Sequence, residues 1–526
     1  MADETATGAF PVQWDDPADA ETCWQYDPEH TPGAIEPLAF DLGLGPFIEG
    51  FGWGLRPRVF NYYPFFRWQQ RAAASGEDAP PSASDFERLR EAGRRWEDEI
   101  LPEVLGHIQR YRTADFAAMS NEQLAEEIER LPELRRRSGE LHTLSITPPH
   151  MALTALVRVY RELTGGDELS AIRLVQGYGN KSVEAGDALW RLSRTAANLP
   201  SVNERILALE DGKTAQTLDE LRRDADARQF VEALDSFLEE FGWRSGASLF
   251  GVTWVEDPSV PLTMLRAYLE TEGYDPAEER RRLGEERDGA VEQALAGLDG
   301  DGRERLRDAI DTAKEVLHLT EDHNFYIDQR LYTMPRRLVL EAGRRLAAAN
   351  VVAQPGDVFF LHLGEFCAAL RGDSAGVSAL SAQRRREFDR WSQVKPPAYV
   401  GAPPPKGAEP RPPASRPERT GDLTGTGASA GVARGPVRVV RTLDEAGRLR
   451  PGDVLVTRVT LPPWTPLFAV ACAVVTEVGG MLGHTATVAR EYGIPAVLAV
   501  RDATLLLQDG QLAEVDGTRG LVRVVG

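Results

Sequence analysis

The chain has 526 residues, enough for two or three domains with large buried cores. Hydrophobic residues make up 42% and charged residues 27%, a balance typical of globular proteins. The formal charge of −21 disfavours nucleic acid and anionic membranes as partners, and no apolar run approaches the roughly 18 residues of a membrane span. The three cysteines lack metal-ligand spacing and no signal-peptide pattern is visible, so we expect a cytoplasmic protein.

Residues 1–395 are predicted to form a mostly α-helical domain that binds an acceptor substrate. Apolar residues recur at three- and four-residue intervals among many glutamates and arginines, as at Leu101, Val104 and Ile108. Period-two alternation, the pattern of strands, is scarce in this part. The segments with helical spacing are 86–112, 121–141, 182–195, 217–241 and 276–350.

A polar cluster falls late in this helical region. With α-helical spacing, Glu321, Asn324 and Asp328 share one face, and His323 and Arg330 lie on an adjacent one. Carboxylate, imidazole, amide and guanidinium groups together can deprotonate a hydroxyl and neutralise a transferring phosphoryl group. The same mixture is typical of a solvated, salt-bridged helix face, and this alternative stays open.

Residues 396–420 are predicted to be a proline-rich linker. Nine prolines fall between positions 396 and 417. Such a segment is excluded from helix and sheet interiors and favours an extended, semi-rigid tether. It serves either as a plain spacer or as an arm on which the C-terminal domain swings.

Residues 421–526 are predicted to form an α/β domain around a histidine motif. An apolar strand ends near Thr476, a turn follows at Gly479 and Gly480, a helix opens at His484, and a second strand follows Pro495. The imidazole therefore lies in the first turn of a helix. Unpaired N–H groups and the helix dipole favour an anion at that place.

The motif at residues 475–500 resembles the phosphohistidine swivelling domain of the PEP-utilising enzymes, which include PEP synthase, pyruvate phosphate dikinase and rifampin phosphotransferase. The family pattern T-E-x-G-G-x-x-S-H-x-x-x-V-A-R-E-x-G-I-P-A-V is matched nearly throughout, with Gly483 where the family often has Ser, Thr or Cys. The resemblance implies that His484 carries a phosphoryl group. It also implies phosphate-supporting roles for Gly480, Thr485 and Arg490.

Shorter segments at 24–38, 174–182 and 237–245 resemble landmarks of the rifampin phosphotransferase acceptor domain. In the last of these, Trp243 stands where a histidine is usual. The resemblance implies that Glu321 and His323 are catalytic residues. Four further residues are expected to contact the substrate: Asn324, Asp328, Arg330 and His30. The remaining histidines, including His142, lack ligand spacing with one another, and we interpret them as structural.

Full-length relatives carry an ATP-grasp module that phosphorylates the histidine, whereas this sequence has no P-loop and no room for such a module beside the helical region. We therefore expect a separate ATP-grasp protein as partner, an arrangement that phenylphosphate synthase shows in this family. The partner would supply ATP and Mg²⁺, and we expect no cofactor or metal bound by this chain.

The expected function is a phosphotransferase subunit that carries a phosphoryl group on His484 to a hydroxyl of a small organic acceptor. Two alternatives remain open. The first is a condensing or dehydrating biosynthetic enzyme that uses phosphoryl transfer to activate a substrate oxygen. The second is a non-catalytic phosphocarrier or regulatory protein.

Overall fold

Helices make up most of the N-terminal part, as its apolar periodicity predicts. The structure, a computed structural model, describes residues 10–28, 31, 33–67, 81–210, 212–245, 251–271, 273–404 and 422–525. The helices before residue 396 are α2 (Pro17–Ala20), α3 (Pro37–Ala39), η1 (Phe40–Leu44), α4 (Gly45–Gly50), α5 (Ala83–Arg95), η2 (Trp96–Ile100), α6 (Leu101–Thr113), η3 (Phe116–Ala118), α7 (Asn121–Glu129), α8 (Leu131–Thr164), α9 (Glu168–Ile172), η4 (Arg173–Val175), α10 (Lys181–Ala197), α11 (Pro200–Leu207), α12 (Thr214–Arg223), η5 (Ala225–Ala227), α13 (Arg228–Phe241), α14 (Ser259–Glu270), α15 (Pro276–Ala296), α16 (Gly300–Val316), α17 (Leu319–His323), η6 (Asn324–Leu331), α18 (Arg336–Ala348), η7 (Pro355–Phe360), α19 (Leu363–Leu370) and α20 (Val377–Trp391).

Local side-chain caps set where several of these helices begin. Ser82 and Asp85 form a capping box at the start of α5, in which each side chain satisfies a backbone N–H of the other residue. Asp275 caps α15, and Pro276 occupies its first position, where a missing N–H costs nothing. These caps satisfy N–H groups that the helices themselves leave unpaired.

The long helix α8 is the axis of the N-terminal body. Helices α4, α5 and α16 pack along it. Apolar side chains of these helices and of α8, such as Ile310 on α16 and Leu141 on α8, join one buried core. Helix α4 approaches α8 so closely that a Cβ at Gly139 would lie 2.0 Å from the carbonyl oxygen of Phe47. The body is therefore held by apolar burial along a rigid central element.

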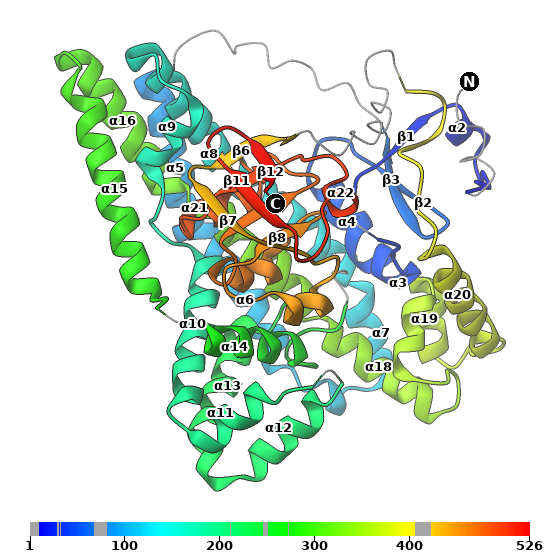
Figure 1. Cartoon of the computed structure of the whole chain (residues 1–526). Coiled ribbons are helices and arrows are strands. Elements are labelled where there is room, and N and C mark those ends of the chain that lie inside the picture. Colours follow the sequence, from blue (N-terminus) through cyan, green and yellow to red (C-terminus); the bar gives the residue numbers. More distant parts are fainter. Residues whose placement is uncertain are drawn as a thin grey trace.

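A small antiparallel sheet lies beside this helical body, and the sequence did not predict it (Figure 1, upper right). Its strands are β1 (Cys23–Tyr26), β2 (Pro57–Phe60), β3 (Tyr63–Arg67) and β4 (Tyr399–Gly401), in the order β2-β3-β1-β4. Strands this short show no period-two pattern long enough to recognise. Strand β4 lies inside the predicted linker, where Val400 pairs with Trp24 as part of an edge strand. Residues 399–401 are thus anchored to the N-terminal sheet and do not act as a free tether.

The C-terminal residues form the predicted α/β domain. One sheet runs in the order β5-β12-β11-β7-β8-β9-β10-β6, and β7, β8, β9 and β10 are parallel neighbours. Its elements are β5 (Leu423–Thr424), β6 (Thr426–Ser429), β7 (Val432–Val439), η8 (Leu443–Arg448), β8 (Val454–Thr457), η9 (Pro462–Ala469), β9 (Ala473–Thr476), α21 (His484–Glu491), β10 (Ala496–Leu498), α22 (Ala503–Leu506), β11 (Leu512–Asp516) and β12 (Leu521–Val524). The fold class is therefore confirmed in both parts.

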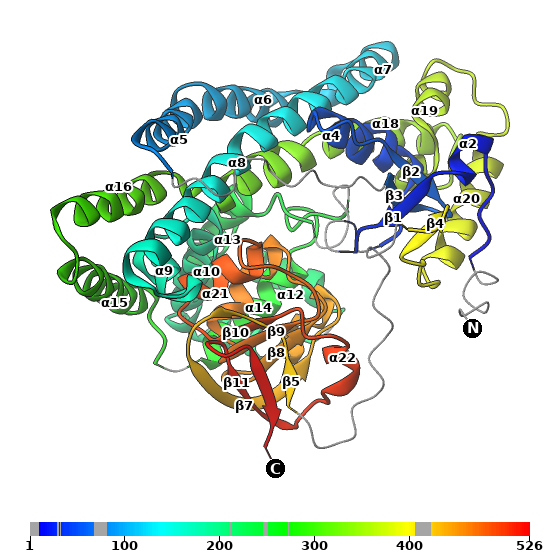
Figure 2. The ribbon, with the colours of Figure 1, turned by 90° about the horizontal axis from the view of Figure 1, so that it is seen from above.

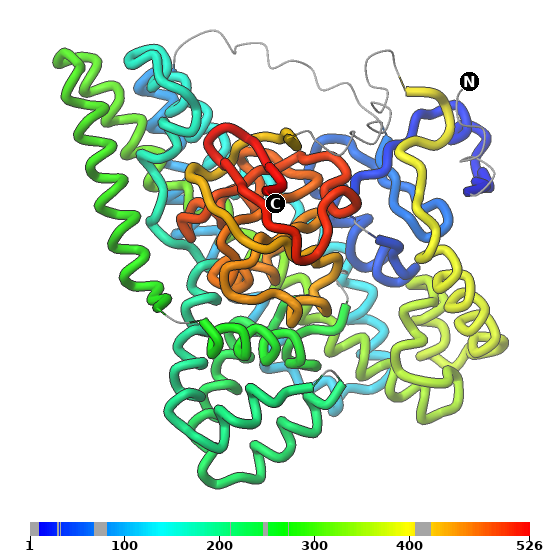
Figure 3. Tube along the Cα trace, in the orientation of Figure 1, coloured from blue at the N-terminus to red at the C-terminus, as the bar shows by residue number. Residues whose placement is uncertain are grey.

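The two parts of the chain share a hydrophobic core. Alternate residues of β9 face opposite sides of the sheet, so that Val475 belongs to the domain's own core and Val474 to a core continuous with α10, α13 and α14. Phe468 and Tyr492 of the C-terminal domain join this shared core. Figures 2 and 3 show the sheet domain seated against the helices. None of the described helices is long and apolar enough to cross a membrane.

Candidate functional site

His484 is the first residue of α21, directly after the loop that follows strand β9. This loop turns sharply at Gly479, whose φ of +129° is a conformation that side-chain-bearing residues rarely adopt. The N-cap residue, Gly483, offers no side chain to the first N–H groups of the helix. These donors and the positive end of the helix dipole are therefore available to an anion beside the imidazole.

Two of the predicted phosphate-supporting residues hold this loop in place. The buried Arg490 donates from Nη1 to the carbonyl oxygens of Met481 and Ala428, each at 3.0 Å. The hydroxyl of Thr485 lies 2.7 Å from that of Thr460. Both side chains therefore have protein partners and position the backbone around His484. The third residue, Gly480, accepts a 3.0 Å hydrogen bond from the N–H of Gly483, and a Cβ at Gly480 would meet no atom within 4 Å.

The imidazole of His484 faces the helical body and contacts Glu321. Nδ1 of His484 lies 2.9 Å from Oε2 and 3.1 Å from Oε1 of this carboxylate. The hydroxyl of Ser182 donates to the same Oε2 at 2.6 Å. Glu321 is almost fully buried, with 2% of its surface exposed. Because Nδ1 donates a hydrogen bond to the carboxylate and keeps its proton, the neutral ring carries its lone pair on Nε2.

Nε2 of His484 is buried and has no hydrogen-bond partner among the described residues. A ring nitrogen that carries a lone pair and has no donor opposite it can act as a nucleophile. The arrangement matches the general triad geometry, in which a carboxylate fixes the tautomer of a reacting histidine.

A buried guanidinium that the sequence analysis overlooked lies close to this pair. Arg244 is 1% exposed, and its Nη1 donates to the carbonyl oxygen of Pro462 at 3.5 Å. Its Nε and Nη2 have no hydrogen-bond partner among the residues that the structure describes, and its guanidinium carbon lies 5.6 Å from the ring centroid of Phe325. Burial lowers the pKa of Arg244 to about 10, and the negative charge of Glu321 opposes this fall. Arg244 therefore stays positive at neutral pH, with donors to spare for an anion.

A second group of predicted residues meets a histidine that the sequence analysis interpreted as structural. We call His142, His323 and Asp328 the His–His–Asp cluster. Asp328 lies 3.0 Å from Nδ1 of His142 and 3.6 Å from Nε2 of His323. Asn324 donates to Asp328 at 3.4 Å and accepts from Gln329 at 2.5 Å. Three of the predicted residues, His323, Asn324 and Asp328, thus lie together.

The pairing of His323 with Asp328 differs from the predicted arrangement, which put them on different helix faces. The chain from Asn324 to Leu331 is a π-helix, whose i→i+5 pattern brings residues five apart onto one face. Burial lowers the pKa of His323 to about 4, so the ring is neutral at pH 7. Its Nδ1 donates to the carbonyl oxygen of Leu319.

The predicted substrate-contacting residue Arg330 does not join this group. Arg330 lies over the ring of Phe325, 5.5 Å from the guanidinium carbon to the ring centroid, and burial lowers its pKa. His30 falls outside the described residues. Asp322, next to Glu321, accepts the backbone N–H of Lys181 at 2.8 Å, and burial raises its pKa to about 7.

Comparison with protein families now identifies both parts. Residues 449–520 match the model described as "PEP-utilising enzyme, mobile domain". The chain contains the mobile domain of the PEP-utilising enzymes. Residues 141–321 match the model described as "Rifampicin phosphotransferase fourth domain". The helical partner of the mobile domain is thus related to a phosphotransferase domain, and His484 lies inside the matched mobile-domain segment.

Three relatives place the mobile domain and its helical partner among larger proteins. The chain is 31% identical over 98% of its length to chondramide synthase of Chondromyces crocatus, covering 14% of that protein. It is 30% identical over 96% of its length to the uncharacterized phosphotransferase YvkC of Bacillus subtilis, covering 62% of it. It is 31% identical over 66% of its length to the rifampicin phosphotransferase of Streptomyces sviceus, covering 40% of it. The chain therefore spans less than two thirds of each of these relatives.

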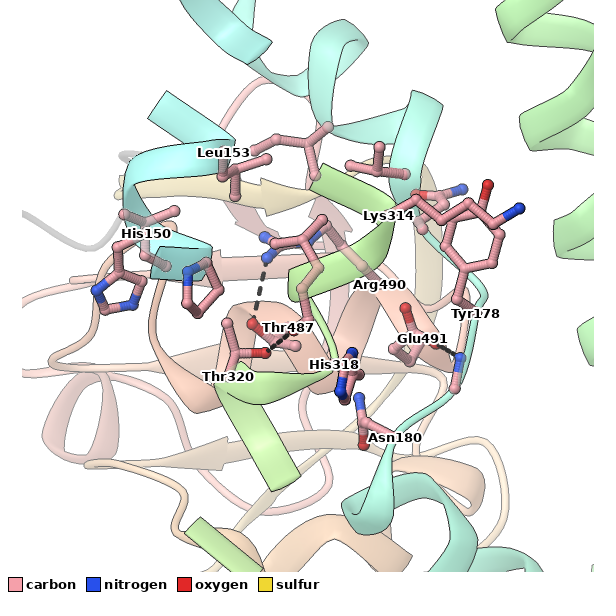
Figure 4. A pocket seen from close by; sticks show the side chains of 17 residues that line it. His150, Leu153, Tyr178, Asn180, Lys314, His318, Thr320, Thr487, Arg490 and Glu491 are labelled. Atoms are coloured by element: carbon pink, nitrogen blue, oxygen red, sulfur yellow. Dashed lines mark hydrogen bonds between the residues drawn. The ribbon is translucent and has the colours of Figure 1, made fainter. Parts of the chain in front are cut away.

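The mobile domain is docked on the helical body by polar contacts as well as by apolar ones. Glu491, the last residue of α21, accepts hydrogen bonds from the backbone N–H groups of Gly177 at 2.9 Å and Gly179 at 2.8 Å. A cavity of about 60 Å³ lies at this junction, where His150 and Tyr178 of the body and Arg490 of the mobile domain line it (Figure 4). That volume is well below the roughly 300–1,000 Å³ of small-molecule pockets. A drug-sized ligand does not fit in this cavity.

Proposed function

We propose that this chain transfers a phosphoryl group from Nε2 of His484 to a hydroxyl group of a small organic acceptor held by the helical body. The observation that carries the proposal is the contact between Nδ1 of His484 and the buried carboxylate of Glu321. This contact fixes the proton on Nδ1 and leaves Nε2 as the reacting atom, at the N-terminus of a helix.

The first half-reaction loads the histidine. Nε2 of His484 attacks the phosphorus of the donor, the new P–N bond forms, and the bond from phosphorus to the donor's leaving oxygen breaks. We propose that an ATP-grasp protein supplies ATP and Mg²⁺ for this step. The relatives longer than this chain are in keeping with a nucleotide-binding part outside these 526 residues.

The second half-reaction unloads the histidine onto the acceptor. The acceptor oxygen attacks phosphorus in line, the P–N bond breaks, and its electron pair returns to Nε2. The proton of the hydroxyl leaves to the His–His–Asp cluster, and the unpaired N–H groups of Arg244 neutralise charge on the phosphoryl oxygens. Glu321 stabilises the positive charge that the ring carries while Nε2 is bonded to phosphorus and Nδ1 keeps its proton.

One observation disfavours a plain phosphocarrier. Glu321 and His323 are 2% and 3% exposed, so the polar run is no solvated helix face. A buried carboxylate held against an imidazole is typical of a catalytic site. Neither Glu321 nor His323 lines the cavity at the domain junction. We therefore do not propose that cavity as the binding site of the acceptor.

The condensing alternative is favoured by one observation. Chondramide synthase, by its name a synthase, matches 98% of this chain. In that reading the phosphorylated oxygen of one substrate leaves as phosphate when a second substrate attacks. Product analysis separates the two functions, because a stable phosphate ester supports transfer, whereas free phosphate with a new bond between two substrates supports condensation.

The test uses phosphoramidate, which phosphorylates histidine chemically and needs no partner protein. The full chain should gain one acid-labile phosphoryl group at His484, located by mass spectrometry at neutral pH. His484→Gln should lose this label, and His362→Gln, which changes an exposed histidine, should keep it. The labelled protein should then pass the group to a hydroxyl in a panel of phenols and alcohols. Equal labelling of the His484→Gln variant would overturn the proposal.

A further inference from the structure

The His–His–Asp cluster has the composition of a metal site. Its three candidate ligand atoms all lie within 4.8 Å of one another. Ligands bound tetrahedrally to one ion at about 2.0–2.2 Å stand about 3.3–3.6 Å apart. The observed separations from Asp328 Oδ2, 3.0 Å to Nδ1 of His142 and 3.6 Å to Nε2 of His323, match this spacing within a few tenths of an ångström.

The hydrogen bonding of His323 leaves its Nε2, a hydrogen-bond acceptor, facing the carboxylate of Asp328, which is also an acceptor. Because Nδ1 donates to the carbonyl oxygen of Leu319, the neutral ring presents an unprotonated Nε2. That lone pair faces the carboxylate oxygen of Asp328 with no proton between them. Two acceptors that face each other repel, and a cation between them converts the repulsion into attraction.

The surroundings supply the outer contacts that metal ligands have in proteins. The Leu319 carbonyl fixes the tautomer of His323, and the Asn324 amide holds the Asp328 carboxylate. The ring of His142 stacks on Phe51 with centroids 5.0 Å apart, so its orientation is fixed as well. The side chains of His142 and Asp328 are 19% and 14% exposed, which gives an ion a route from solvent.

We propose that His142, His323 and Asp328 bind one divalent transition-metal ion. Two imidazoles and one carboxylate suit Zn²⁺, Mn²⁺ or Fe²⁺ and disfavour Mg²⁺ and Ca²⁺, which prefer all-oxygen sites. Three protein ligands leave coordination positions open, as at catalytic metal sites. The ion would lie on the same helical run as Glu321, two residues from His323, and an oxygen in the open position would lose its proton more readily.

The test measures metal binding alone, so its failure would leave the proposed transfer reaction standing. With the ion bound, the cluster would take up the hydroxyl proton through an oxygen held in the open coordination position and not on its own side chains. The purified full chain is treated with a chelator and titrated with Zn²⁺, Mn²⁺ and Co²⁺ by calorimetry, and metal content is measured by mass spectrometry. We expect one equivalent of a transition metal per chain, no comparable binding of Mg²⁺, and visible absorption bands of bound Co²⁺.

Variants locate the ion. Asp328→Asn and His142→Phe should each weaken binding more than about tenfold, and the second keeps the aromatic contact with Phe51. A matched control exists in His362 and Asp41, a His–Asp pair at 2.9 Å that belongs to no three-ligand cluster among the described residues. His362→Gln should leave binding unchanged. Circular dichroism shows whether each variant is folded. Absence of binding in the folded wild type would overturn the inference. So would binding by Asp328→Asn and His142→Phe as tight as that of the wild type.

Discussion

Nδ1 of His484 lies 2.9 Å from Oε2 of Glu321, and this contact joins the C-terminal domain to the helical body at His484. The same oxygen accepts the hydroxyl of Ser182 at 2.6 Å, so three segments of the chain meet at one carboxylate. Glu321 thereby has two effects. It fixes the tautomer of His484, and it binds the mobile domain in its docked position.

The first prediction concerns the charge of Glu321. Glu321→Gln keeps the size of the side chain but removes the negative charge opposite the ring. We expect discharge of phosphorylated His484 to slow by about 10²–10⁴-fold, because the protonated ring loses its counter-charge. Rapid-quench measurement of the phosphoenzyme checks this. Glu97→Gln is a matched control, since Glu97 is an exposed glutamate 3.8 Å from His318. Discharge of Glu321→Gln at the wild-type rate would remove Glu321 from the mechanism.

The second prediction concerns Arg244. Arg244→Met should lower the transfer rate by about 10²-fold or more, because the phosphoryl oxygens lose a preorganised cation. It should not lower stability, since an apolar chain of similar length replaces a buried charge, two of whose nitrogens have no hydrogen-bond partner among the described residues. Kinetics and urea unfolding measure the two effects.

Arg135 provides the comparison for this result. It is equally buried, but its guanidinium donates to the carbonyl oxygens of Leu331 and Tyr332. Arg135→Met should therefore destabilise the fold, on the order of 3 kcal/mol, because it leaves buried carbonyls unpaired. If Arg244→Met destabilises the protein as much as Arg135→Met, the role of Arg244 is structural.

The third prediction concerns the docking of the mobile domain. A Cβ at Gly186 of α10 would lie 2.0 Å from the hydroxyl oxygen of Tyr492. Gly186→Ala should therefore displace the mobile domain and slow discharge about tenfold or more, while chemical phosphorylation of His484 continues. The alanine itself favours the helix. Adding Tyr492→Phe removes the clashing oxygen and should restore the rate. If the double variant stays slow, the effect arises from elsewhere in α10.

The fourth prediction concerns pH and Asp322. Burial raises its pKa from 3.8 to about 7, so the folded state binds a proton that the unfolded state has lost between these two values. Its contribution to stability is therefore fully present below about pH 4 and is lost as pH rises through 7. Asp322→Asn mimics the protonated form. It should exceed the wild type in unfolding free energy at pH 8, by a difference on the order of 4 kcal/mol that shrinks towards pH 4. An equal difference at both pH values would contradict the raised pKa.

Much of the mobile domain followed from local sequence. The run around His484 combines a strand, a glycine turn and a helix start, and each of these is set by residues close together in the chain. The position of the imidazole at a helix N-terminus is therefore readable before any fold is known. The N-terminal sheet was not readable, because its strands are short and β4 joins β1 from more than 370 positions along the chain.

The sequence alone determined the helical character of the N-terminal part, the α/β character of the C-terminal part and the place of His484. Only the tertiary structure decided which side chains meet. An α-helical period separated His323 from Asp328, whereas the π-helix that begins at Asn324 puts them on one face. His142 reaches the same carboxylate from α8, and Arg244 is buried beside Glu321 by the packing of separate helices. Contacts of this kind depend on how whole elements pack, and no short-range pattern in the chain encodes them.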